Sequence, residues 1–134
     1  MKIDGCKLTP LRIIPAEKGD VMHALKASDE GFSAFGEAYF SSVKKGENKG
    51  WKRHLRMTMN LVVPVGRIRF SLKDGRTDSS TFGVEDGIEL SPENYQRLTV
   101  PPGIWVAFEG KNEGINLLLN IADLPHDPAE VESA

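Results

Sequence analysis

Cysteine is nearly absent from this sequence, since Cys6 is the only one among 134 residues. A lone cysteine excludes a disulfide within the chain and fits a reducing compartment. The first ten residues, MKIDGCKLTP, hold no apolar segment of the signal-peptide kind, so the protein is expected to be cytoplasmic. Cys6 is interpreted as a buried or inert thiol, with a nucleophilic role as the alternative.

Long apolar runs and an excess of one charge are also missing. No apolar run approaches the length of a membrane span, so no membrane partner is expected. The 17 basic and 19 acidic residues leave a formal net charge of −2. This charge gives no reason to expect that the protein binds nucleic acid. Hydrophobic residues make up 40% of the chain and charged residues 27%, as in ordinary globular proteins. The length suits a single domain, residues 1–134, around one core.

Helical periodicity is scarce, whereas short alternating runs and turn signals recur along the chain. Strands are predicted over residues 9–14, 21–26, 35–43, 51–57, 59–65, 67–72, 82–90, 97–100, 104–109 and 115–121. Residues 91–95 (SPENY) suit a single helical turn, and an acidic tail from about residue 125 is expected to fray. The pattern predicts an all-β, antiparallel sandwich or barrel.

The stretch GENKGWKRHLRMTMNLVVPVG, residues 46–66, holds the most informative pair of side chains. Alternation along a strand puts Lys52 and His54 on the same face, about 6–7 Å apart. A cation beside a titratable imidazole on an otherwise apolar sheet is either a functional site or a solvated surface. His23, which has apolar neighbours in another predicted strand, is interpreted as a core or interface histidine.

The same stretch resembles the first motif of the cupins. That motif reads Gly, five residues, His, one residue, His, four residues, Glu, six residues, Gly. This sequence has Gly46, Lys52, His54, Met59 and Gly66 at the corresponding positions, with the same spacing. The resemblance implies a cupin-type jelly-roll barrel, whose inner face would carry Lys52 and His54.

The second cupin motif contains Pro, any residue, Gly, two residues and His. Residues 101–103 (PPG) are followed after two residues by Val106. The four ligand positions of the resemblance therefore hold Lys52, His54, Met59 and Val106, of which only His54 is a competent metal ligand. Because a retained catalytic metal usually has at least three protein ligands, no metal and no cofactor are expected.

The resemblance narrows to the dTDP-4-dehydrorhamnose 3,5-epimerases and the related sugar-nucleotide 3,4-ketoisomerases. The segments that carry it, in the same order as in those families, are residues 49–52 (KGWK), 82–83 (FG), 90–94 (LSPEN) and 102–104 (PGI). His54 falls on the second His of the ketoisomerase motif. The catalytic set of the epimerases is substituted, however: their base His is Lys52, a further His is Val106, and residues 116–120 lack their Tyr.

The resemblance implies chemistry on a 4-keto sugar. Such chemistry needs a base that removes the proton next to the carbonyl and a positive group that holds the enolate oxygen. His54 is the candidate base, Lys52 the electrostatic partner, and Tyr39 the residue that returns a proton. The candidate substrate-binding residues are Lys49, Arg56, Asn116 and Asn120. Each of these side chains has an alternative interpretation, facing solvent or bonding only to backbone.

Two classes of function stay open at this point. The first is an epimerase or ketoisomerase acting on a nucleotide-linked 4-keto-6-deoxy sugar in surface polysaccharide biosynthesis. The second is a non-catalytic cupin that binds a sugar, a sugar nucleotide or a protein partner. A homodimer is expected in both, because the predicted edge strand 9–14 ends in Ile-Ile-Pro and would otherwise leave an apolar edge exposed.

Overall fold

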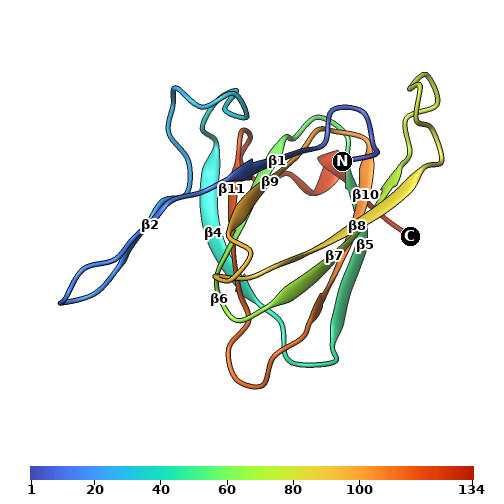
Figure 1. The fold of residues 1–134 in the computed structure, drawn as a ribbon. Helices are drawn as coiled ribbons and strands as arrows, with labels where there is room; N and C mark the ends of the chain where they lie inside the picture. Colours follow the sequence, from blue (N-terminus) through green and yellow to red (C-terminus); the bar gives the residue numbers. More distant parts are fainter.

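The computed structural model describes residues 1–134 and consists almost entirely of β-strands (Figure 1). The elements are β1 (Lys7–Pro10), β2 (Ile13–Ile14), β3 (Val21–Met22), β4 (Glu37–Ser42), β5 (Asn48–His54), β6 (Met59–Val65), β7 (Ile68–Asp74), β8 (Glu85–Leu90), β9 (Gln96–Val100), β10 (Ile104–Gly110), β11 (Leu117–Ala122), the 3-10 helix η1 (Pro128–Glu130) and β12 (Val131–Ser133). All the paired strands are antiparallel, which confirms the predicted all-β jelly roll.

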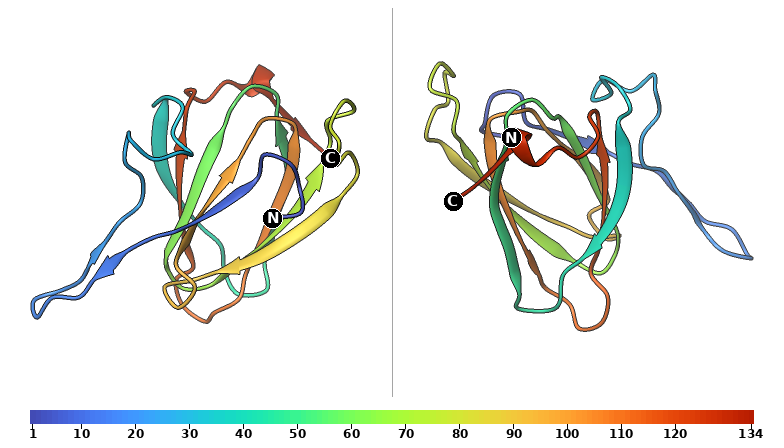
Figure 2. Two further views of the ribbon diagram at one scale, coloured as in Figure 1. Left: turned by 45° about the horizontal axis from the view of Figure 1, so that its top comes forward. Right: turned by 180° about the vertical axis from the view of Figure 1, so that it is seen from behind.

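Two five-stranded sheets form the walls of the barrel (Figure 2). The first, called the β4 sheet, has the order β1-β9-β6-β11-β4, and the second, called the β5 sheet, has the order β12-β5-β10-β7-β8. In Figure 1, β4 and β5 stand on opposite sides of the barrel interior. The fold therefore turns the inner faces of these two strands toward a common interior.

Alternation along the strands fills the core between the sheets. On β7, Ile68, Phe70 and Leu72 are fully buried, whereas the residues between them are not, as the period of two in the sequence predicted. Leu98 and Val100 of β9 contribute from the opposite sheet. The apolar filling occupies one part of the barrel and leaves the inner face of β4 and β5 to polar side chains.

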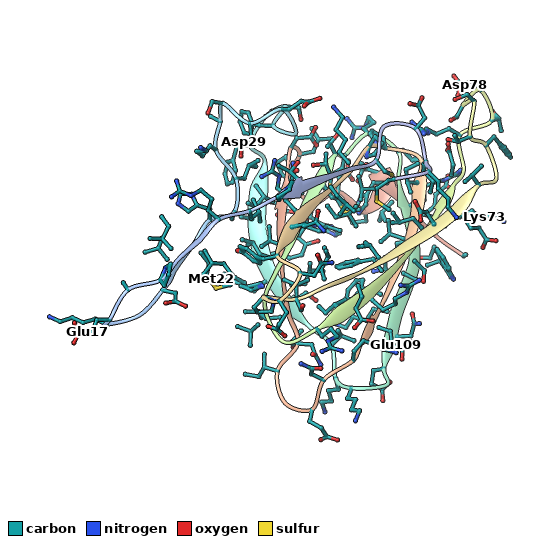
Figure 3. The ribbon with its side chains drawn as sticks, viewed as in Figure 1. Glu17, Met22, Asp29, Lys73, Asp78 and Glu109 are labelled. Carbon is teal, nitrogen blue, oxygen red and sulfur yellow. The ribbon has the colours of Figure 1, made fainter.

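The β2–β3 hairpin stands away from the barrel (Figure 1). Figure 3 shows Glu17 near its tip and Met22 closer to the sheets. The predicted strands 9–14 and 21–26 are shorter in the structure, because the chain leaves the β4 sheet after Pro10, the last residue that pairs with β9. The strands β2 and β3 pair only with each other and belong to neither five-stranded sheet.

Two segments differ from the sequence-based expectation. Residues 91–95 form a tight β-turn closed by hydrogen bonds between Ser91 and Asn94, not a helical turn. The acidic segment expected to fray instead forms η1, capped by Asp127, and then β12, which pairs with β5. Backbone pairing and the burial of Glu130 hold this segment in place. The chain contains no helix with the length and apolar character needed to cross a membrane.

Candidate functional site

A cavity of about 240 Å³ lies between the two sheets. The residues that line this barrel cavity are Tyr39, Ser41, Lys49, Gly50, Lys52, His54, Met59, Leu61, Val106, Phe108, Leu118 and Asn120. Half of them are hydrophobic, and the polar ones come from β4 and β11 on one wall and from β5 on the other. An apolar cavity with a few convergent polar groups is the usual form of a small-molecule site.

Lys52 and His54 both reach the barrel cavity from β5, where alternation places them on one face. Lys52 pairs across the ladder with Val106 of β10, and His54 pairs with Val131 of β12. The structure thus brings together the two residues that the sequence placed on one strand face, and that face is the interior.

His54 is held by a buried carboxylate. Its Nδ1 lies 2.6 Å from Oε1 of Glu130, and the side chains of His54 and Glu130 are 13% and 1% exposed. The other oxygen of Glu130 accepts hydrogen bonds from the backbone N–H groups of Arg56 (2.8 Å) and Met57 (2.9 Å). With Nδ1 engaged by the carboxylate, Nε2 is the ring nitrogen without a protein partner, and it is available to the cavity.

The hydrogen bonds to Glu130 keep this carboxyl ionised. Burial alone would raise the pKa of Glu130, but the hydrogen bonds from His54 and from the backbone N–H groups of Arg56 and Met57 outweigh burial and lower the pKa below its ordinary value. An ionised carboxylate at Nδ1 fixes the orientation of the imidazole and stabilises the imidazolium that forms when Nε2 takes up a proton.

Tyr39 and Asn120 form the polar part of the opposite wall. They are directly opposite each other on β4 and β11, and Nδ2 of Asn120 donates a hydrogen bond of 3.0 Å to the Tyr39 hydroxyl oxygen. Asn120 is 3% exposed, whereas Tyr39 is 44% exposed and lies where the cavity meets solvent. A phenol and an imidazole therefore line one cavity from its two sheets.

Lys49 lies beside these groups on β5. Its Nζ donates a hydrogen bond of 3.3 Å to the hydroxyl of Ser41 on β4. Neither Lys49 nor Lys52 forms an ion pair with an acidic residue. Two ammonium groups are thus available to an anionic ligand at the cavity.

The structure does not bring Arg56 and Asn116 to the cavity. Because β5 ends at His54, the alternation does not continue to Arg56, whose exposed guanidinium lies 3.6 Å from Asp127. The amide of Asn116 is fully buried and bonds the backbone: its Nδ2 donates to the carbonyls of Val43 and Asn112. The interpretation of Asn116 as a residue that bonds only to backbone fits this geometry.

Two other side chains considered from the sequence also lie outside the cavity. Cys6 is buried, and burial raises the pKa of its thiol to about 12, which leaves almost no thiolate at neutral pH. His23 is partly exposed, and its backbone carbonyl accepts a hydrogen bond from the Tyr95 hydroxyl. Neither residue lines the barrel cavity.

Glu130 is the site residue that sequence reasoning missed. It lies 76 positions from His54 along the chain, in a segment whose acidic composition suggested a solvated tail. The one local signal is Asp127 followed by Pro128, a helix start that places Glu130 at the end of a single turn. Contact between that turn and β5 depends on tertiary structure, which local patterns do not encode.

Comparison with known proteins places the chain among sugar-nucleotide enzymes. No model of a known protein family matches it. The crystal structure of a dTDP sugar isomerase from Desulfovibrio desulfuricans G20 has 42% identity and a TM-score of 0.96, over 99% of this chain and 85% of that one. A probable low-salt glycan biosynthesis epimerase, Agl13 of Haloferax volcanii, is 26% identical over 120 residues, 88% of this chain and 77% of that protein.

More distant structures share the fold. The dTDP-6-deoxy-D-glucose-3,5-epimerase RmlC of Legionella pneumophila, in complex with dTDP-4-keto-L-rhamnose, has a TM-score of 0.89 at 23% identity. This likeness covers 99% of this chain and 74% of that one.

Proposed function

Because the chain belongs to the cupin family of dTDP-sugar isomerases and epimerases, we propose that it epimerises a nucleotide-linked 4-keto-6-deoxy sugar by proton transfer next to the keto group. The observation that carries the proposal is the arrangement of His54. Its imidazole faces the barrel cavity and is oriented by the buried carboxylate of Glu130.

In the proposed reaction, Nε2 of His54 removes the proton from a carbon that flanks the keto group. The negative charge passes to the keto oxygen, where the ammonium of Lys52 stabilises the enolate. This charge is present in the transition state and not in the bound substrate, so the interaction lowers the barrier selectively. Tyr39 then returns a proton to the same carbon, and solvent restores both groups to their starting protonation states.

The positions of these groups favour epimerisation over ketoisomerisation. His54 belongs to the β5 sheet, and Tyr39 belongs to the β4 sheet on the other side of the barrel interior (Figure 1). A carbon between them loses its proton toward one wall and regains one from the other, which inverts its configuration. A ketoisomerase instead moves the carbonyl to the neighbouring carbon and needs no donor on the opposite face.

The size and charge of the cavity support a nucleotide-linked substrate. At about 240 Å³ it lies below the range of about 300–1,000 Å³ usual for sites that enclose a drug-sized ligand. It therefore suits the sugar, while the nucleotide lies at the mouth, where Lys49 is available to the diphosphate. Asn120 and the apolar side chains of Met59 and Leu118 are buried residues of the cavity lining, and the two apolar ones suit a sugar with a methyl group in place of a hydroxyl.

We further propose that the protein is a cytoplasmic homodimer that acts in the biosynthesis of surface polysaccharide. The projecting β2–β3 hairpin exposes Val21, and the outer side of the β4 sheet exposes Phe40. Apolar groups in such positions are typical of surfaces that a second subunit covers. Sedimentation at micromolar concentration should give the mass of a dimer, and a monomer alone would refute this part.

The function is tested with dTDP- and GDP-linked 4-keto-6-deoxy sugars in deuterated water. Epimerisation predicts an inverted product that carries deuterium at the inverted carbon, identified by NMR. A product in which the keto group has moved to the neighbouring carbon would show that the protein is a ketoisomerase and not an epimerase. Tight binding without exchange of any proton would contradict catalysis and favour the sugar-binding cupin.

A further inference from the structure

Asn116 and Asn120 are both buried, the first just before β11 and the second within it, but only Asn116 has a partner for every polar atom of its amide. The amide of Asn116 bonds the backbone of Val43, Asn112 and Arg67, so its polar atoms have partners. The amide of Asn120 makes a single hydrogen bond in the protein, from Nδ2 to the Tyr39 hydroxyl, and its Oδ1 is buried without a partner. A buried polar atom without a partner costs free energy, and fold stability does not explain why it is kept.

We propose that Asn120 is a positioning residue, which orients the Tyr39 hydroxyl as a proton donor into the barrel cavity. The inference rests on the proposed function, because it concerns the proton that Tyr39 returns to the sugar. It goes further in assigning to Asn120 a role that acts through Tyr39.

The direction of the hydrogen bond carries the argument. A phenol has one O–H donor and two acceptor positions. Since Nδ2 of Asn120 donates to the Tyr39 oxygen, one acceptor position is filled and the phenolic proton does not point at Asn120. Both residues line the cavity, so the proton can be donated to a ligand bound there, in place of the water that otherwise reaches the half-exposed Tyr39.

The same hydrogen bond assists the transfer itself. When the proton leaves, the phenolate oxygen gains negative charge, and the N–H of Asn120 already points at it. Hydrogen bonds to charged groups are stronger than those to neutral ones, so the interaction strengthens as the charge develops. Asn120 is 3% exposed and sits on a strand between the buried Leu118 and Ala122, so its donor is held in place with little competition from water.

The test uses Asn120→Leu and Asn120→Asp. Leucine removes the N–H donor and keeps a similar volume. Aspartate keeps the shape but accepts a hydrogen bond from the Tyr39 hydroxyl, where asparagine donates one to it. Both should lower kcat about 10- to 100-fold, the expected effect of losing a hydrogen bond to a charged group, and change KM less than about threefold. Asn120→Leu should change the melting temperature little, because the loss of the hydrogen bond to Tyr39 is offset by the removal of a buried Oδ1 that has no partner. Asn48→Leu, at the exposed start of β5, is the control and should leave kcat unchanged.

A double-mutant cycle separates positioning from structure. If Asn120 acts through Tyr39, adding Asn120→Leu to Tyr39→Phe should cause no further loss of kcat. A full additional loss in the double variant would overturn the inference while leaving the proposed function intact. A wild-type protein that catalyses no exchange would instead refute the proposed function, and the positioning role with it.

A spectroscopic readout examines the contact without any activity. The chain has two tyrosines, so labelling tyrosine with carbon-13 at Cζ gives two signals. Asn120→Leu should shift the Tyr39 signal and leave that of Tyr95, whose hydroxyl bonds His23, in place. An unmoved Tyr39 signal would contradict the inference whatever the kinetics.

Discussion

Two carboxylates, those of Asp74 and Glu130, are buried in this protein and satisfied in different ways. Asp74 accepts hydrogen bonds from Arg76, Ser79 and Thr81, all within seven positions of it. Glu130 accepts from His54 and from backbone 73 and 74 positions away, and its partner imidazole faces the barrel cavity. Burial and ionisation are shared by both groups, so the difference lies in what the carboxylate holds: a surface loop in one case, a candidate base in the other.

The Asp74 network organises the loop between β7 and β8. Figure 3 shows Asp78 at the far end of this loop, away from the sheets. Arg76 pairs with Asp74 at 2.9 Å and also donates to the backbone carbonyl of Asp4, which joins the loop to the amino-terminal segment. None of these residues lines the barrel cavity. A change at Asp74 should therefore alter stability and leave the chemistry unchanged.

The largest expected effect on stability is that of Asp74→Asn. It leaves Arg76 without its ion-pair partner and weakens the hydrogen bonds of Ser79 and Thr81. The free energy of unfolding should fall by about 3 kcal/mol, measured by urea denaturation, while kcat of the folded fraction stays at the wild-type value. A variant with wild-type stability and low kcat would reverse the roles assigned to the two carboxylates.

Glu130→Gln should lower kcat, which Asp74→Asn should leave unchanged. The amide keeps the shape but no longer supplies a negative charge at Nδ1 of His54, so the imidazolium formed during catalysis loses its stabilisation. The value of kcat should fall about 100-fold with little change in KM, and stability should fall by about 1–3 kcal/mol. The measurement is the rate of deuterium incorporation at saturating substrate, with Glu132→Gln, whose side chain is exposed on β12, as the control.

Lys52→Gln should have a smaller effect, confined to catalysis. Glutamine still donates a hydrogen bond to the enolate oxygen but lacks the positive charge, so a loss of about tenfold in kcat is expected. Lys52 forms no ion pair in the structure, so the melting temperature should not fall. Lys111→Gln, an exposed lysine outside the cavity, serves as the matched control. An unchanged kcat would remove Lys52 from the proposed mechanism.

The smallest expected effect is on the pH dependence of stability in acid, to which both carboxylates contribute in the same direction. Hydrogen bonds from Arg76 above all, helped by Ser79 and Thr81, hold the pKa of Asp74 far below its ordinary value, although burial alone would raise it. The pKa of Glu130 is lowered as well. Both groups therefore stabilise the folded state fully above the ordinary pKa values of 3.8 and 4.5, and this contribution is lost as the pH falls through the lower folded values. Stability measured from pH 6 to pH 2 should decline less steeply in Asp74→Asn than in the wild type.

The sequence was enough to predict the barrel and one wall of its cavity. Alternation in 67–72 predicted the buried face of β7, and alternation around Lys52 and His54 placed both side chains on one strand face. Those features are local, because successive residues of a strand point to opposite sides. The resemblance to cupins supplied the rest, namely that this face is the interior.

The remaining features depend on contacts between distant segments. Nothing in the tail sequence shows that β12 pairs with β5, or that Glu130 reaches His54. Asn116 and Asn120 have the same side chain on the same strand region, and only the fold shows that one bonds backbone and the other bonds Tyr39. Arg56 does not lie on the expected face, because β5 ends at His54, two residues before it.

The most direct test of the central claim, that His54 is the base, is the rate of deuterium incorporation in His54→Ala. The substrate is the 4-keto-6-deoxy sugar nucleotide that the wild type turns over, and the matched control is His126→Ala, which removes an exposed histidine outside the cavity. Loss of the base should slow incorporation about 10²- to 10⁴-fold while dTDP still binds, and the control should exchange at the wild-type rate. Incorporation at the wild-type rate in His54→Ala would contradict the account.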